Sequence, residues 1–274
     1  MQGTSLRAVA RPGPGLGEMW RTLRLAFDHR QDRLAFGRAV SALSVRYLRY
    51  RGVPIEGGRW LDVGTGVGAL PEALGGAGAR VTSLDIRDQR DSRAEADPFV
   101  LGSGDRLPFR GEVFDGVSSA NVLEHVADPW AVIDELIRVC RPAGALYVSW
   151  TNWYSPFGGH DWSPFHYAGT RLGPRLYRAV RGKDPMHLPG RTLFPVHVGT
   201  VIRGLADRPV QVLDVAPRYW PQLHSLARVP GLREVALWNC VILMRKLPAG
   251  SAPRPARFTP RGRRTGVGGA TRGR

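Results

Sequence analysis

Thiols are scarce in this chain, which has two cysteines, Cys140 and Cys240, among its 274 residues. Both stand in apolar segments, and they do not form the closely spaced pairs that bind zinc or the disulfide framework of small secreted domains. We therefore predict two reduced, buried thiols and a cytoplasmic protein.

Long apolar segments are also missing. A helix that spans a bilayer needs about 20 mostly apolar residues, and the longest candidate, residues 235–244, is interrupted by Asn239. Residues 1–15 lack the apolar stretch that a secretory signal carries. The sequence predicts neither a transmembrane segment nor export.

Lysine is almost absent, with Lys183 and Lys246 as the two examples, although the net charge is +16. Arginine therefore carries the positive charge, and seven arginines but no acidic residue lie in residues 251–274. A GC-rich genome often produces such a bias, whereas a basic surface can also attract nucleic acid or anionic lipid. We favour a solvated tail and keep nucleic acid as an alternative partner.

Glycine and proline divide the chain into segments. We predict a disordered N-terminus over residues 1–17, a helical segment over residues 18–57 and one domain over residues 58–246. Residues 247–274 are expected to form a disordered Arg-rich tail. Within the domain, residues 151–208 lack a clean period before a final helix, and they are predicted to be a substrate-facing insertion.

Short apolar runs alternate with helix-length segments from residue 58 onward, which indicates an α/β fold with a mainly parallel sheet. Asp128-Pro129 predicts a helix start, because Asp is a favoured N-cap and Pro a favoured first residue. Another helix is predicted over residues 196–205, and Phe36, Val40 and Leu43 share one face of a helical pattern over residues 18–51. Strands are predicted over residues 60–63, 80–85, 98–101, 113–119, 145–150, 210–215 and 236–244.

A glycine-rich loop follows the first predicted strand, where residues 60–70 read Trp-Leu-Asp-Val-Gly-Thr-Gly-Val-Gly-Ala-Leu. Glycine permits positive φ and close approach of a ligand, and the amides at the following helix start suit acceptor groups. Asp85 ends the second strand, where a carboxylate can accept the hydroxyls of a ribose. NAD and S-adenosylmethionine both satisfy this pattern.

Asp62 discriminates between the NAD and the S-adenosylmethionine hypotheses. A carboxylate two residues before the first glycine repels a pyrophosphate. The same carboxylate attracts the ammonium group of a methionine moiety, directly or through water. An Asp62 that only stabilises the turn is the structural alternative. Asp62 therefore favours S-adenosyl-L-methionine and makes an NAD-dependent oxidoreductase the weaker hypothesis.

Further motifs follow the loop in the order and spacing of a known family, namely Leu107-Pro108-Phe109, Phe114-Asp115, Asn121-Val-Leu-Glu-His125 and Arg141-Pro-Ala-Gly144. The sequence resembles class I S-adenosylmethionine-dependent methyltransferases over about residues 58–150. It is nearest the ubiquinone/menaquinone-methyltransferase-like group and uncharacterised actinobacterial methyltransferases. The resemblance implies a Rossmann-like three-layer α/β sandwich with a seven-stranded, mostly parallel sheet and an antiparallel last strand.

The resemblance also implies cofactor contacts. It assigns them to Asp62, Gly64, Thr65, Gly66, Gly68, Asp85, Ile86, Ser103, Gly104 and Asn121. Ile86 is expected to pack on adenine, Ser103 and Gly104 to lie at the adenine edge, and Asn121 beside the methionine part. One departure stands out, because many relatives carry an acid four residues before Leu107, where this chain has Ser103.

Methyl transfer from a sulfonium is an in-line displacement in which the protein aligns the nucleophile and can remove its proton. His160, His125 and His166 are the predicted catalytic histidines, with His160 as the first candidate within the aromatic segment 150–167. Two alternatives to catalytic roles remain. His125 can support the cofactor loop, and the aromatic segment can pack as a structural lid. The remaining histidines form no ligand pattern, so we predict no metal site.

The leading hypothesis is methyl transfer to a small molecule, at an oxygen of an apolar or aromatic metabolite, lipid or glycoside. A nucleic-acid methyltransferase is an alternative, although amino-methylating members usually carry Asn/Asp-Pro-Pro-aromatic where this chain has Asn121-Val-Leu-Glu. A non-catalytic cofactor-binding module is the other alternative. The intact Asp62, glycine triplet and Asp85 argue against it.

Overall fold

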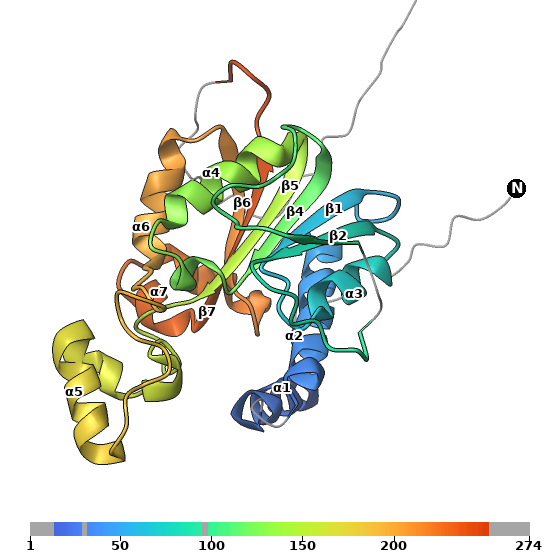
Figure 1. Ribbon diagram of the computed structural model, residues 1–274. Helices are drawn as coiled ribbons and strands as arrows, with labels where there is room; N and C mark the ends of the chain where they lie inside the picture. The colour runs from blue at the N-terminus through green and yellow to red at the C-terminus, as the bar shows by residue number, and fades with distance from the viewer. Residues whose placement is uncertain (1–13, 29–31, 95–97, 252–274) are drawn as a thin grey trace, which may run out of the picture.

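The computed structural model describes residues 14–28, 32–94 and 98–251, and it places seven strands in one sheet with helices on both faces (Figure 1). This confirms the predicted three-layer α/β architecture. The strands are β1 (Arg59–Val63), β2 (Arg80–Asp85), β3 (Phe99–Leu101), β4 (Phe114–Ala120), β5 (Cys140–Thr151), β6 (Val210–Pro217) and β7 (Asn239–Lys246).

The strand order is β3-β2-β1-β4-β5-β7-β6. The pairs from β3 to β5 are parallel, whereas β7 is antiparallel to both β5 and β6, as the resemblance implied. The chain order reverses between β1 and β4, and open α/β sheets bind ligands beyond the carboxyl ends of the strands at such a point. The topology therefore directs attention to the residues after Val63 and Ala120.

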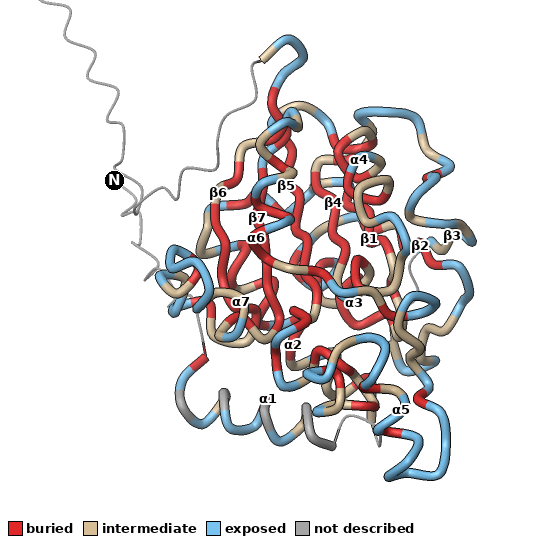
Figure 2. The backbone as a smooth tube through the Cα atoms, turned by 90° about the vertical axis from the view of Figure 1, so that its left-hand side faces the viewer, coloured by how far each residue is buried: buried red, intermediate tan, exposed pale blue. Residues whose placement is uncertain are grey.

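Helices cover the two faces of the sheet through different strand residues. Leu61 and Val63 of β1 pack in the core beneath α4 (Pro129–Val139) and α6 (Val198–Gly204). Trp60 points the other way, into the core beneath α2 (Arg33–Tyr50) and α3 (Ala69–Gly75). Alternate residues of a strand face opposite sides, which explains why β1 reads as a continuous apolar run with only Asp62 between. The buried backbone in Figure 2 follows these strands and the inner helix faces.

Several predicted boundaries were wrong. The helical pattern over 18–51 is two helices, α1 (Leu16–Asp28) and α2, so helix already begins within the N-terminus predicted to be disordered. The insertion contains a helix, α5 (Gly169–Arg181), whose period is hidden by internal glycine and Pro174. β7 starts at Asn239 because the apolar residues before it form α7 (Leu232–Ala236).

The C-terminal boundary also differs from the prediction. Leu247 is buried, and its N–H donates to the Pro209 carbonyl at 2.8 Å, so the packed chain continues past residue 246. The predicted disorder of residues 1–13 and the Arg-rich segment from residue 252 onward lie outside the described residues.

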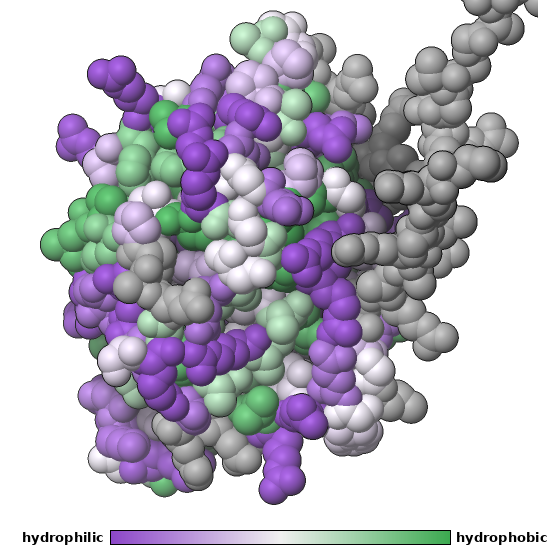
Figure 3. All heavy atoms as spheres, turned by 90° about the vertical axis from the view of Figure 1, so that its right-hand side faces the viewer, coloured by the Kyte–Doolittle hydropathy of each residue, from purple (hydrophilic) through white to green (hydrophobic). Residues whose placement is uncertain are grey.

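Five further short helices complete the described chain: η1 (Leu123–His125), η2 (His160–Trp162), η3 (Phe165–Ala168), η4 (Leu205–Asp207) and η5 (Pro221–Arg228). Among the described residues, no helix combines the length and the apolar character that crossing a membrane requires. On the face shown in Figure 3, hydrophilic side chains are interspersed with hydrophobic ones. The insertion has a small core of its own, in which Trp153, Trp162 and Tyr177 are buried.

Gly116 in β4 provides a test of this packing. A Cβ at that position would lie 2.5 Å from Cδ2 of the buried Trp60 ring, so Gly116→Ala should destabilise the fold by about 1–3 kcal/mol through overpacking. Gly75 has open space around its would-be Cβ, and Gly75→Ala is the matched control. Urea unfolding measures both, and equal midpoints for the two variants would contradict the arrangement of β1 and β4.

Candidate active site at the carboxyl edge of the sheet

The glycine loop between β1 and α3 has the backbone that the sequence predicts. Gly64, Gly66 and Gly68 have φ of +77°, +56° and +86°, a region that favours glycine. A Cβ on Gly64 would collide with the side chain of Val122, whereas Gly66 has open space around its would-be Cβ. The first glycine therefore lets the loop pack against the end of β4, and the second leaves the backbone open to a ligand.

Two carboxylates hold this loop in place. Asp62 is buried, and its two oxygens accept hydrogen bonds from the hydroxyls of Thr65, at 2.8 Å, and Ser118, at 2.6 Å. Asp85 at the end of β2 accepts a hydrogen bond from the Gly66 amide at 2.9 Å. The turn-stabilising role weighed for Asp62 is therefore real, and it places a fixed negative charge at the base of the loop.

The residues predicted to surround an adenosine lie near one another at the end of β2. The Gly102 amide donates to the Asp85 carbonyl at 3.0 Å, which brings the turn at Ser103 and Gly104 beside that strand end. A Cβ on Gly104 would lie 3.1 Å from Cγ1 of Val63, so this turn also packs against the end of β1. Ile86 is 64% exposed, an unusual setting for a large apolar side chain, and it is available to cover an apolar ring.

Asn121 follows β4 and has a φ of +58°. Its amide donates to the Ser149 carbonyl at 2.8 Å, and its Oδ1 accepts a hydrogen bond from Asn239 Nδ2 at 2.7 Å. Asn121 thus joins the ends of β4 and β5 to the start of β7. The left-handed backbone turns the chain sharply into η1, which carries His125.

Three histidines from separate segments meet beyond this strand end. The ring centroids of His125 and His160 lie 5.0 Å apart, and His187 lies 4.8 Å from His160 and 5.6 Å from His125. We call these three residues the histidine cluster. Sequence reasoning missed His187, because residues from three distant segments share no spacing that could reveal the contact.

His125 and the adjacent Glu124 are fixed by backbone contacts. Nδ1 of His125 lies 2.8 Å from the Thr192 carbonyl, so Nδ1 is the donor and Nε2 is the nitrogen that can face a ligand. Oε1 of the buried Glu124 accepts a hydrogen bond from the Thr151 amide at 2.7 Å. Burial raises the pKa of Glu124, and nearby His125 partly opposes that shift.

His160 has a strained backbone and a desolvated ring. Its φ is +52°, and Nδ1 is buried without a hydrogen bond of normal geometry. Burial, followed by the neighbouring His125 and His187, lowers the pKa of His160 to about 3. The nearby Gly158 backbone partly opposes this pKa shift. The imidazole is therefore neutral near pH 7. Strained non-glycine residues gather at functional sites.

Asp161 holds His187 of the histidine cluster in place. Its Oδ1 accepts a hydrogen bond from Nδ1 of His187 at 2.7 Å, and its Oδ2 accepts one from the Met186 amide at 2.7 Å. Burial alone would raise the pKa of Asp161, but these hydrogen bonds outweigh it and leave the pKa lowered. Asp161 thus orients His187 and joins two separate segments of the insertion.

His166 lies elsewhere. Its side chain is fully buried in the insertion, where its ring packs against Trp153 and Trp162. Nε2 of His166 lies 3.1 Å from the Ser155 carbonyl, and burial lowers its pKa. The structure therefore brings His125 and His160 together and gives His166 a packing position.

Half-buried aromatic side chains lie along the same edge, and one of them, Phe157, lies in the aromatic segment 150–167 selected from the sequence. Trp238 is central, with ring centroids 5.2 Å from Trp220 and 5.8 Å from Phe157. Tyr219 continues the series, 5.9 Å from Trp220 and 6.5 Å from Phe36 of α2. We call these five residues the aromatic wall.

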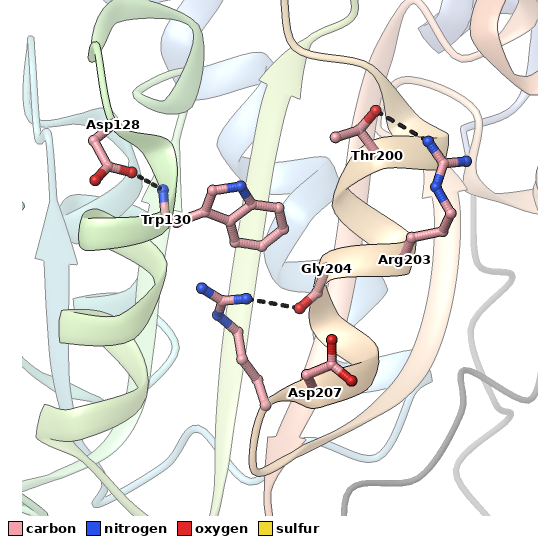
Figure 4. Close-up of a pocket in the computed structure, with 7 residues that line it drawn as sticks. Asp128, Trp130, Thr200, Arg203, Gly204 and Asp207 are labelled. Carbon is pink, nitrogen blue, oxygen red and sulfur yellow. Dashed lines mark hydrogen bonds between the residues drawn. The ribbon is translucent and has the colours of Figure 1, made fainter.

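A surface cavity of about 560 Å³ lies between α4 and α6 rather than at the glycine loop (Figure 4). Arg208 lies over the Trp130 ring, 4.2 Å from its centroid, and donates to the Gly204 carbonyl at 2.7 Å. None of the predicted site residues lines this cavity. The chemistry-bearing side chains of the described chain gather at the sheet edge instead.

Comparisons with known proteins agree with this geometry. Residues 61–148 match the methyltransferase-domain family model. An uncharacterized methyltransferase of Mycolicibacterium vanbaalenii is 38% identical over 68% of this chain and 75% of its own, and one from Mycobacterium leprae is 34% identical over 82% and 89%. The crystal structure of an S-adenosylmethionine dependent methyltransferase from Mesorhizobium loti, 19% identical, shares the fold with a TM-score of 0.51 over 75% of this chain and 98% of its own.

The residues that match the family model include the glycine loop and the motifs after β4. The predicted resemblance to actinobacterial methyltransferases, the enzyme class and the cofactor are confirmed, whereas the ubiquinone/menaquinone-like subgroup stays a prediction. The chain therefore belongs to the S-adenosylmethionine-dependent methyltransferases, and its cofactor is S-adenosyl-L-methionine.

Proposed function

We propose that this enzyme transfers the methyl group of S-adenosyl-L-methionine to an oxygen of an apolar or aromatic small molecule, such as a metabolite, lipid or glycoside. The observation that carries this proposal is the meeting of three features at one sheet edge. The glycine loop follows β1, and the histidine cluster begins four residues beyond Asn121 at the end of β4. The aromatic wall is built around Trp220 and Trp238, which flank the paired ends of β6 and β7.

The cofactor is assigned to the loop side of this edge. The Asp85 carboxylate accepts hydrogen bonds from the ribose hydroxyls, and Ile86 covers the adenine. The turn at Ser103 and Gly104 lies at the edge of the adenine ring. The open backbone at Gly66 admits the ligand, supported by Thr65 and Gly68. Asp62 supplies negative charge for the methionine ammonium, through water if its two hydroxyl partners remain in place.

The acceptor is assigned to the other side, between the aromatic wall and the histidine cluster. Apolar walls with a few convergent polar groups are typical of small-molecule sites. The imidazoles of His125 and His160 accept a hydrogen bond from the acceptor hydroxyl and orient its oxygen toward the methyl carbon. As the new C–O bond forms, the hydroxyl proton passes through these imidazoles to bulk water, and the C–S bond breaks with its electron pair left on sulfur. Residues 151–208, which carry His160, His187 and α5, supply the substrate specificity.

We also propose a cytoplasmic location. Cys140 and Cys240 are both buried free thiols, a state that a reducing compartment maintains.

The cofactor assignment predicts the effect of one isosteric change. Asp85→Asn should weaken S-adenosylhomocysteine binding about 10- to 100-fold, because hydrogen bonds to a charged group contribute about 1.5–3 kcal/mol. Asp134→Asn, which removes an exposed carboxylate paired with Arg208 on α4, is the control and should bind normally. Calorimetric titration measures both, and equal affinities would remove Asp85 from the cofactor site.

The aromatic wall makes a separate prediction about the acceptor. Trp238→Ala should raise the KM for an apolar acceptor at least about tenfold, because burial of a large apolar side chain is worth about 1.5–3 kcal/mol. Binding of S-adenosylhomocysteine should stay unchanged. Formation of S-adenosylhomocysteine across a panel of phenols and hydroxylated lipids would identify an acceptor and give its KM.

Trp130→Ala is the matched control, since Trp130 lines the cavity between α4 and α6. A raised KM in this variant, with an unchanged KM in Trp238→Ala, would move the acceptor to that cavity.

A further inference from the structure

The buried Glu124 side chain has one carboxyl oxygen without a hydrogen-bond partner of normal geometry. The residue is 1% exposed, and Oε1 is engaged by the Thr151 amide, whereas Oε2 is buried without a hydrogen-bond partner. An unpaired buried carboxylate oxygen is costly, because the lost hydration is not replaced.

Glu124 belongs to a group of residues with the composition of a metal site. Glu124, His125 and His160 each offer one ligand atom, and the three atoms lie within 4.8 Å of one another. Two imidazoles and one carboxylate bind zinc in catalytic sites and iron(II) in open facial sites. Magnesium prefers oxygen ligands and water, so the two nitrogens favour a first-row transition metal.

We propose that Glu124, His125 and His160 bind a divalent transition-metal ion, with zinc as the reference ion. Bonds of 2.0–2.2 Å place neighbouring ligand atoms of a tetrahedral site about 3.3 Å apart, so the separations between the three ligand atoms must shorten by up to about 1.5 Å. The three protein ligands leave a fourth position open, as catalytic zinc sites do.

The surroundings are those of a prepared ligand set. The Thr192 carbonyl accepts from Nδ1 of His125 and leaves Nε2 for the ion, which is the outer-shell contact that orients most metal-binding histidines. A divalent cation would supply Oε2 of the buried Glu124 with the partner that it lacks.

The ion would act on the acceptor oxygen, and this role rests on the proposed function, whereas ion binding does not. An acceptor hydroxyl in the open position loses its proton to bulk water more readily, because the cation stabilises the alkoxide or phenolate. That oxygen attacks the methyl carbon, the C–S bond breaks with its electrons left on sulfur, and a methyl ether and S-adenosylhomocysteine are formed. His125 and His160 then act as ligands rather than as bases.

Zinc binding to the full chain tests the proposal. Protein stripped with EDTA and dialysed is titrated with ZnCl₂ by calorimetry, and one ion per chain is expected. Glu124→Gln, His125→Gln and His160→Gln should each weaken zinc binding by more than about 100-fold, since even outer-shell changes cost 10- to 100-fold. His224→Gln, which removes a histidine from η5, is the control and should bind zinc like the wild type.

Zinc-edge X-ray absorption of the wild-type protein needs no variant, and two imidazole nitrogens are expected around the ion. A coordination shell without imidazole, no stoichiometric binding, or equal loss in His224→Gln would overturn the site. Titration with S-adenosylhomocysteine separates the two proposals. If the protein binds S-adenosylhomocysteine but not zinc, the metal site alone is contradicted. If the folded wild-type protein does not bind S-adenosylhomocysteine, the methyl-transfer proposal is contradicted.

Discussion

Parallel pairing of β1, β2, β4 and β5 forces the ends of these four strands to one edge of the sheet, and the rest of the site depends on that constraint. Each strand delivers a different group there. β1 leads into the glycine loop, and β2 ends on Asp85. β4 leads to Asn121 and the histidine on η1, while β5 opens the insertion. Because β7 runs antiparallel to β5, its start brings Asn239 and the preceding Trp238 to the same edge.

Buried carboxylates convert this proximity into fixed geometry. Asp62 connects the loop after β1 to Ser118 of β4, and Asp85 connects β2 to Gly66. Glu124 connects η1 to the end of β5 and, through its carbonyl, to the amide of Phe194 at the far end of the insertion. The site therefore has no separate scaffold, since the groups assigned to ligands also hold the loops. Asp62 stabilises the turn, and its predicted contact with the cofactor remains compatible with that role.

Sequence reasoning succeeded where the chemistry is local. The glycine triplet, Asp62 and Asp85 lie within one strand-loop-helix-strand unit, so spacing alone predicts their arrangement. It failed where distant segments meet. His187 reaches His125 and His160 through Asp161 and the Thr192 turn, and the aromatic wall draws on α2, the insertion and two strand ends. No periodicity encodes such contacts, because they exist only after the sheet has formed.

Cofactor, acceptor and ion are all assigned to one edge of the sheet, and the cavity between α4 and α6 is the competing location. A crystal structure with S-adenosylhomocysteine bound tests this most directly. We expect adenine on Ile86, the ribose hydroxyls on Asp85 and the sulfur directed toward His125 and His160. A ligand seated between Trp130 and Arg203, or a sulfur facing away from the histidine cluster, would contradict the account.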